Sequence, residues 1–251
     1  MSAVLREQVL SDLRDRISFI EGEGVKKAGC LPFGLADIDG ILPGGGLAHG
    51  ALHEFAGGGS GTIDGAAAAL FAAGIAARTK GPVVWCMTRP DLFFPALAQA
   101  GLHPKRVIFV ESDREEDVAA NMEEALSYGG CGAVIGEMVR LPMVTSRRLQ
   151  LVAERTGTIA LAVRRWRRQT EANDFGQPTA SVTRWRVSVM PSEALPVPGI
   201  GRPRWFLELM RSRAGECAEF IVGACDDQGR LHIPAGSVDG SNTSRRSLHS
   251  G

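Results

Sequence analysis

Apolar residues recur every three to four positions along the first twenty residues. They are Val4, Leu5, Val9, Leu13, Ile17 and Ile20. This spacing places them on one face of an α-helix, as in an amphipathic helix. The stretch that follows, GEGVKKAG (22–29), has the composition of a linker. We therefore predict a helical arm over residues 1–24 that docks either on its own domain or on a partner.

From residue 31 onward short apolar runs alternate with longer stretches of helical period. Short apolar runs without a helical period predict buried strands at 51–56, 83–88, 106–112, 132–138 and 158–164. Helical patterns predict helices at 66–78, 90–101, 113–128 and 145–157, the last capped by Thr145 or Ser146. Strands that alternate with helices through short connections predict an α/β fold, in which a mostly parallel twisted sheet has helices on both faces.

The final third changes to a strand-only pattern. Residues 181–189 alternate Thr183, Trp185 and Val187 against Arg184 and Arg186, which predicts a strand with one buried face. Further strands are expected at 204–212 and 218–224, so the sheet closes with antiparallel pairs. Residues 191–203 contain four prolines and predict an irregular loop.

The composition is that of an ordinary globular chain. Of its 251 residues, 44% are apolar and 22% are charged, and no apolar run approaches the roughly 18 residues that span a bilayer. We expect a core over residues 25–235 and a disordered tail over 236–251. The amino terminus lacks the pattern of a signal peptide, so we expect a cytoplasmic protein. The five cysteines are scattered and only His49 and His53 lie close together, so no metal site is expected.

The net charge of zero hides an uneven distribution. Between residues 140 and 213 there are 14 arginines, no lysine and five acidic residues, which gives 14 − 5 = +9. Such a segment is typical of a surface for a polyanion or an acidic partner. The alternative is a solvated face whose charge is balanced by the acidic half of the chain.

A glycine-rich stretch, EFAGGGSGTIDGA (54–66), lies between a predicted strand and a predicted helix. A phosphate-binding loop would occupy this place, with the pattern GxxxxGK[ST]. Here Thr62 replaces the lysine and Ile63 replaces the hydroxyl that holds magnesium. We therefore expect no ATP hydrolysis, no cofactor and no metal. The degenerate phosphate loop consists of Gly57, Gly58, Gly59, Ser60, Gly61 and Thr62.

The stretch LPFGLADIDGILPGGGLAHGALHEFAGGGSGT (31–62) resembles the opening of the RecA recombinase core. The resemblance extends to about residue 232 and implies a RecA-like fold. Most RecA catalytic positions are lost, because its catalytic glutamate falls near Thr88 and its magnesium-binding aspartate falls on Gly136. Two cations that reach across the RecA subunit interface correspond to Arg211 and Arg213. The DNA-contacting loop of RecA corresponds to residues 165–181.

A RecA-like core with an amino-terminal helix and an eroded phosphate loop resembles the ImuA family. This resemblance implies a non-catalytic accessory protein in SOS-induced translesion synthesis that binds ImuB and an error-prone DnaE-type polymerase. It also implies RecA and single-stranded DNA as candidate partners, and association with the nucleoid when partners are bound. The alternatives are a SulA-like inhibitor of cell division and a weak ATP-dependent recombinase-like protein.

Four arginines surround a tryptophan within the segment that corresponds to the RecA DNA loop. They combine charges that could pair with phosphates and a ring that could stack on a base. Contact with DNA, contact with an acidic partner and simple solvation are all open for this cluster. Its members are Arg164, Arg165, Trp166, Arg167 and Arg168.

Overall fold

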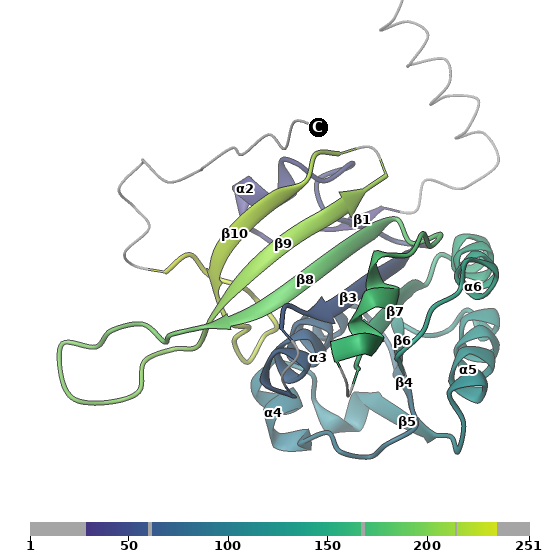
Figure 1. Ribbon diagram of the computed structural model, residues 1–251, viewed down its shortest axis with the longest axis horizontal. Coiled ribbons are helices and arrows are strands. Elements are labelled where there is room, and N and C mark those ends of the chain that lie inside the picture. The colour runs from purple at the N-terminus through teal and green to yellow at the C-terminus, as the bar shows by residue number, and fades with distance from the viewer. Residues whose placement is uncertain (1–28, 60–61, 167–168, 214, 235–251) are drawn as a thin grey trace, which may run out of the picture.

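The computed structural model describes residues 29–59, 62–166, 169–213 and 215–234. Within these ranges an eight-stranded sheet carries the fold, in the order β10-β9-β8-β3-β7-β6-β4-β5 (Figure 1). The predicted helical arm over 1–24 and the predicted tail over 236–251 lie outside the described residues.

The six strands from β3 to β8 are mutually parallel, and β9 and β10 are added antiparallel. The predicted α/β class and the antiparallel closing strands are thus confirmed. The strands are β3 (Leu52–Gly57), β4 (Val83–Met87), β5 (Val107–Glu111), β6 (Ala133–Met138), β7 (Ile159–Arg164), β8 (Thr183–Met190), β9 (Arg204–Ser212) and β10 (Ala218–Gly223).

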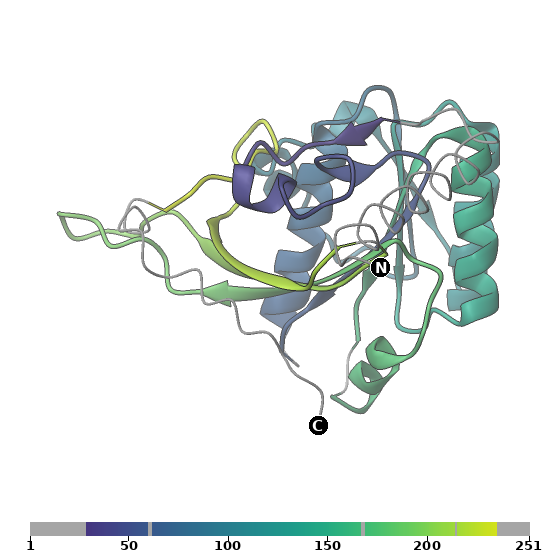
Figure 2. The ribbon, with the colours of Figure 1, turned by 90° about the horizontal axis from the view of Figure 1, so that it is seen from above.

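Helices cover both faces of the parallel half, as the alternating pattern predicted (Figures 1 and 2). α3 (Thr62–Ala77) and α4 (Phe94–Gln99) pack on one face. α5 (Glu115–Tyr128) and α6 (Met143–Thr156) pack on the other. Two apolar cores result, one on each side of the sheet.

α3 is almost entirely alanine and glycine along its buried face, and these small residues let its backbone approach the sheet. A Cβ on Gly74 would collide with the sulfur of Cys225. The aromatic rings of Phe71, Trp185 and Trp205 fill the remaining space beside it, with centroids about 6 Å apart (6.2 and 5.9 Å from Phe71). Close approach and edge-to-face rings together hold α3 against β8 and β9.

Two small elements precede the main sheet. β1 (Cys30–Leu31) and β2 (Leu47–Ala48) pair antiparallel, and the short helix α2 (Ala36–Asp39) lies between them. The carboxylate of Asp39 accepts hydrogen bonds from the backbone N–H groups of Phe33 (2.6 Å) and Gly34 (2.8 Å). Asp39 therefore stabilises this turn, as expected for an aspartate in such a position.

The helix starts differ from the prediction by two to four residues, and α3 begins at Thr62 and not at residue 66. α6 begins after Pro142, so neither Thr145 nor Ser146 is the cap. The N–H of Ser146 instead bonds the carbonyl of Pro142 (2.9 Å) inside the first turn. α4 begins at Phe94 and not at residue 90, with Pro95 in its first turn, where a missing N–H costs least.

Two 3₁₀ helices complete the described fold, one of three residues and one of eight. They are η1 (Pro104–Arg106) and η2 (Gln169–Gly176). No helix in the described ranges is long and apolar enough to cross a membrane.

Candidate functional site

The glycine-rich loop joins the end of β3 to the start of α3. In parallel α/β sheets this edge, at the carboxyl ends of the strands, is where ligands bind. Gly57 closes β3 and Thr62 opens α3, while Ser60 and Gly61 lie outside the described residues. The predicted position of the loop is therefore found, with Thr62 and the largely exposed Ile63 where a lysine and a magnesium-binding hydroxyl would be needed.

Two amides of this loop, those of Gly58 and Gly59, already have acceptors within the chain. The N–H of Gly58 donates to the carbonyl of Val187 (2.8 Å), and that of Gly59 donates to Oδ2 of Asp64 (2.8 Å). The other carboxylate oxygen of Asp64 accepts from the N–H of Val189 (2.8 Å). Asp64 thus ties the loop to β8 and places a negative charge in the first turn of α3, where a phosphate would otherwise bind.

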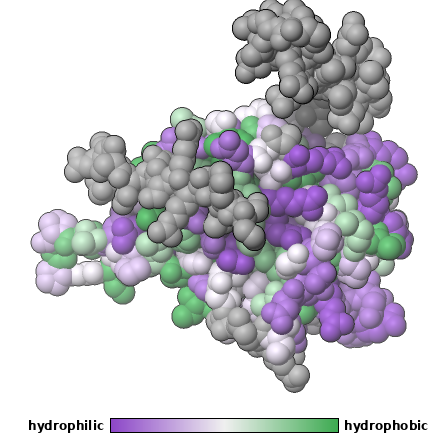
Figure 3. Space-filling model, turned by 45° about the horizontal axis from the view of Figure 1, so that its top comes forward, coloured by the Kyte–Doolittle hydropathy of each residue, from purple (hydrophilic) through white to green (hydrophobic). Residues whose placement is uncertain are grey.

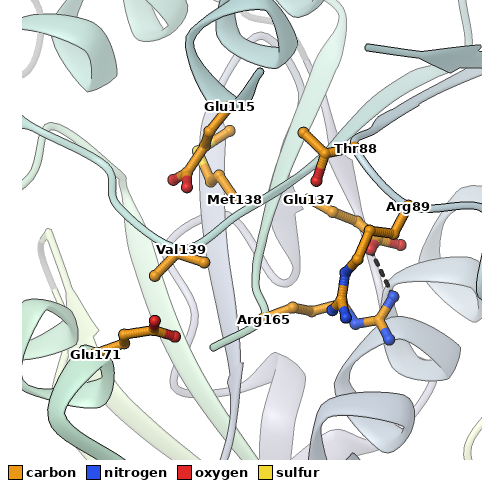
Figure 4. A pocket seen from close by; sticks show the side chains of 8 residues that line it. All are labelled: Thr88, Arg89, Glu115, Glu137, Met138, Val139, Arg165 and Glu171. Atoms are coloured by element: carbon orange, nitrogen blue, oxygen red, sulfur yellow. Dashed lines mark hydrogen bonds and ion pairs between the residues drawn. The ribbon is translucent and has the colours of Figure 1, made fainter. Parts of the chain in front are cut away.

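A second feature of this edge is a hollow of about 240 Å³ beyond the ends of β4, β6 and β7 (Figure 4). Its side chains carry both signs of charge. The residues that line it are Thr88, Arg89, Glu115, Glu137, Met138, Val139, Arg165 and Glu171.

Glu137 and Arg165 are paired in the wall of this hollow. Nη1 of Arg165 lies 2.6 Å from Oε2 of Glu137 and 2.8 Å from Oδ1 of Asp91. The other oxygen of Glu137 accepts from the indole N–H of Trp85 (2.9 Å). Burial raises the pKa of Glu137, and Arg165 and Trp85 act in the opposite direction. The carboxylate of Glu137 is therefore already used in an internal ion pair.

Arg164 is not on the surface, which corrects its assignment to a cluster that contacts DNA or a partner. Its side chain is fully buried, with Nη1 2.5 Å from Oε1 of Glu54 and the second nitrogen paired with Asp174. Both Nε and Nη2 also donate to the carbonyl of Val139. Every part of this guanidinium has a partner inside the protein, so none remains for a phosphate.

Arg184 is buried as well, although the strand pattern predicted it on the polar face of β8. Its Nε lies 2.9 Å from Oε2 of Glu54, and the ring of Phe175 stacks beneath its guanidinium at 5.1 Å. Glu54 also accepts from the hydroxyls of Thr179 (2.9 Å) and Ser181 (3.1 Å). This buried network fixes the end of segment 165–181 to the sheet.

The other described members of the predicted cluster are Arg165 and Trp166. The ring of Trp166 packs beside that of Phe175, with centroids 5.8 Å apart. Arg165 is paired as described above, and Arg167 and Arg168 lie outside the described residues. Of the three described members, Arg164 is buried and Arg165 is ion-paired, so the structure does not present these three as one free surface cluster.

Arg211 and Arg213 lie at the opposite edge of the sheet from the hollow, beside the start of β8. Both are exposed near the end of β9. Nη1 of Arg211 donates to the carbonyl of Thr179 (2.7 Å), and the backbone N–H of Arg213 donates to the carbonyl of Val182. The predicted role of the two arginines at an interface stays a prediction.

Of the two histidines before the loop, His53 has both ring nitrogens paired inside the chain. His53 is buried in β3, where Nε2 lies 3.0 Å from the carbonyl of Ala48 and Nδ1 lies 2.8 Å from the hydroxyl of Thr183. The indole N–H of Trp185 donates to that same hydroxyl, which leaves its proton for Nδ1 of His53. Among the described residues no group of His, Cys, Asp and Glu side chains could hold a metal ion.

Sequence reasoning missed two residues that define this site, Glu54 and Asp64. Each carried a signal, because Glu54 is the charged residue within an otherwise uncharged buried strand and Asp64 lies in the first turn of the helix after the loop. What could not be read was the partner of each, which comes from a distant part of the chain.

Two relatives match most of the chain. The protein is 37% identical over 204 residues to Protein ImuA of Caulobacter vibrioides strain NA1000, in an alignment that covers 77% of this chain and 83% of the relative. Protein ImuA of Caulobacter vibrioides strain CB 15 matches with the same figures. No family model matches the sequence.

Proposed function

The chain belongs to the ImuA family, and on this premise we propose that it is a non-catalytic accessory protein of SOS mutagenesis. In this proposal the protein has a RecA-like fold and acts in error-prone translesion synthesis by binding ImuB. Through ImuB it joins the DnaE-type polymerase. RecA and single-stranded DNA are further candidate partners.

The observation that carries the non-catalytic part is the position of Asp64. Its carboxylate accepts from the N–H groups of Gly59 and Val189, both at 2.8 Å, so a fixed anion occupies the start of α3. A nucleotide phosphate would have to displace this carboxylate and would meet no lysine in its place. Like charges at such short range disfavour binding. A loop of this kind supports a protein that acts by binding other proteins and not by hydrolysing ATP.

We expect the protein to show no magnesium-dependent affinity for ATP. Titration calorimetry with ATP, with and without magnesium, measures this directly. In an Asp64→Asn variant the anion is removed while one acceptor oxygen stays, so weak anion affinity should rise by about tenfold at most, without any dependence on magnesium. Micromolar, magnesium-dependent binding by the parent protein would contradict the proposal.

We expect the full-length protein to retain ImuB in a pull-down without nucleotide, and the Asp64→Asn variant to retain it equally. Versions that lack residues 1–24 or 236–251 serve to locate the contact relative to the core. If ImuB is retained only in the presence of ATP, or not at all, the proposed role is wrong.

The SulA-like alternative predicts a different result in cells. Overproduction of an inhibitor of division gives filamentous cells, whereas an accessory protein of mutagenesis leaves division intact and raises damage-induced mutation. The alternative of a recombinase-like ATPase is tested by the same calorimetry. The ImuA-type role is favoured here because the family match covers 83% of the relative.

A further inference from the structure

The hollow beyond the ends of β4, β6 and β7 lies at the edge where parallel α/β sheets bind ligands, and the proposed role in mutagenesis does not use it. Its volume of about 240 Å³ is below the roughly 300–1,000 Å³ of pockets that enclose a drug-sized ligand. A nucleotide is therefore too large for it, whereas one side chain or a small organic ion fits.

Two arginines in the wall of the hollow are already balanced by carboxylates. Nη1 of Arg165 is held by Oε2 of Glu137 (2.6 Å) and Oδ1 of Asp91 (2.8 Å). Nη2 of Arg89 lies 3.6 Å from Oδ2 of Asp91. Two guanidinium groups thus stand against two carboxylates, so this part of the wall carries no net charge. It therefore has little to offer an anionic ligand.

Two more carboxylates line the hollow and make it negative overall. Figure 4 shows Glu115 and Glu171 on one side, with Val139 between them, and the two arginines on the other. Glu115 begins α5, and its Oε1 accepts from the backbone N–H of Arg140 (2.5 Å), which is a neutral donor. Within the described ranges no cation forms an ion pair with Glu115. A cation is therefore favoured here over an anion.

The remaining lining groups suit an alkyl chain that ends in a cationic group. Met138 and Val139 offer apolar surface, and the hydroxyl of Thr88 is a further acceptor. Basic side chains lay their methylene stems along apolar surface and keep the charged end in polar surroundings. Since no group of His, Cys, Asp and Glu side chains in the described part of the chain could hold a metal ion, an organic cation is favoured over a metal.

We propose that the hollow binds the guanidinium group of an arginine side chain that a partner protein presents. The planar guanidinium donates to Glu115 and Glu171, and the stem lies against Met138 and Val139. Hydrophilic residues gather on the side of the molecule that carries α5 and α6, to the right in Figure 3, so a partner at this side is recognised by polar contacts. Arginine is enriched at the centres of protein interfaces, which favours a protein as the source of the cation.

The proposal goes beyond the role in mutagenesis and does not depend on it. A titration of the full chain with the blocked peptide acetyl-Gly-Arg-Gly-amide, followed by ¹⁵N–¹H NMR, measures the binding. We expect saturable shifts of the amide signals of Val139 and Arg140, with a dissociation constant of about 1–10 mM, because one partly exposed ion pair is weak. The matching citrulline peptide keeps the shape without the charge and should not bind.

Variants of the lining carboxylates locate the contact. Glu115→Gln keeps an acceptor for the N–H of Arg140 and should weaken binding of the arginine peptide about fivefold, and Glu171→Gln should have a similar effect. Glu124→Gln removes an exposed carboxylate of the same helix that does not line the hollow, and it should leave the affinity unchanged. An equal loss in all three variants would mean that only the general negative charge attracts the peptide, which overturns the proposal.

Other ligands distinguish the source of the cation. Agmatine carries the same guanidinium and stem without a peptide, and an affinity close to that of the arginine peptide supports recognition of the side chain alone. Agmatine binding that is at least about tenfold tighter would identify a free amine as the ligand and would overturn the assignment to a partner protein. The proposal is also wrong if the arginine peptide shows no saturable binding up to about 50 mM, if the citrulline peptide binds equally, or if inorganic phosphate shifts the same amide signals.

Discussion

Replacing Glu54 by glutamine should lower the free energy of unfolding by about 3–5 kcal/mol. Glu54 is completely buried and is the shared acceptor for Arg164 (2.5 Å) and Arg184 (2.9 Å). The amide keeps the shape of the carboxylate but removes its charge, so two buried guanidinium groups lose their main counter-charge. Urea denaturation monitored by tryptophan fluorescence measures the change.

A matched surface pair serves as the control for Glu54. Arg186 and Glu208 are cross-strand neighbours at 3.5 Å and are both partly exposed. Glu208→Gln should therefore change stability by no more than about 1 kcal/mol. Adding Arg184→Met to Glu54→Gln should cost less than the sum of the two single changes, because the second change removes one of the stranded charges. A loss below about 1 kcal/mol for Glu54→Gln alone would show that the network does not carry the expected energy.

Acid should destabilise the protein through His53 before the bulk of its carboxylates are protonated. Burial lowers the pKa of His53 from 6.5 to about 4, with the Ala48 carbonyl acting in the opposite direction. Between these two values the unfolded chain binds a proton that the folded chain does not, so stability falls as the pH falls from about 6.5 to about 4. A difference of this size corresponds to about 3 kcal/mol. Above pH 7 this contribution is constant.

The measurement is the unfolding free energy of the parent and of His53→Gln at several pH values from 4 to 8. Glutamine cannot be protonated, so its curve should be flatter in this window even if the variant is less stable at pH 8. Burial also lowers the pKa of His49, and that residue is unchanged in both proteins. Parallel curves for the two proteins would refute the assignment to His53.

The fold was predictable from the sequence to an unusual extent for the parallel half. Five of the predicted strands and four predicted helices occur where the hydrophobic period places them, since that period is a local property. The errors were at the ends of helices. Pro95 lies in the first turn of α4 and Pro142 directly precedes α6, and neither proline has an N–H that would need a partner.

The candidate site was predictable only in part. The sequence predicts a degenerate phosphate loop from the residues that it lacks, with Thr62 and Ile63 in their places, and this stays a prediction. The arginine cluster was not predictable, because an arginine beside a tryptophan has the same sequence signature on a surface and in a buried ion pair. Phe175 and Asp174, which receive Arg164, lie in the segment that was expected to contact DNA.

The sequence by itself determined the order and type of the elements and the absence of a lysine and a magnesium hydroxyl from the loop. Both depend on residue type and local spacing, which the chain displays directly. Only the tertiary structure decided which charges are available. Glu54 and Arg164 are 110 positions apart and meet because β3 and β7 are neighbours in the sheet. Asp64 and Val189 are 125 positions apart. Their contact holds a carboxylate at the start of α3, which the glycines of the loop alone could not show.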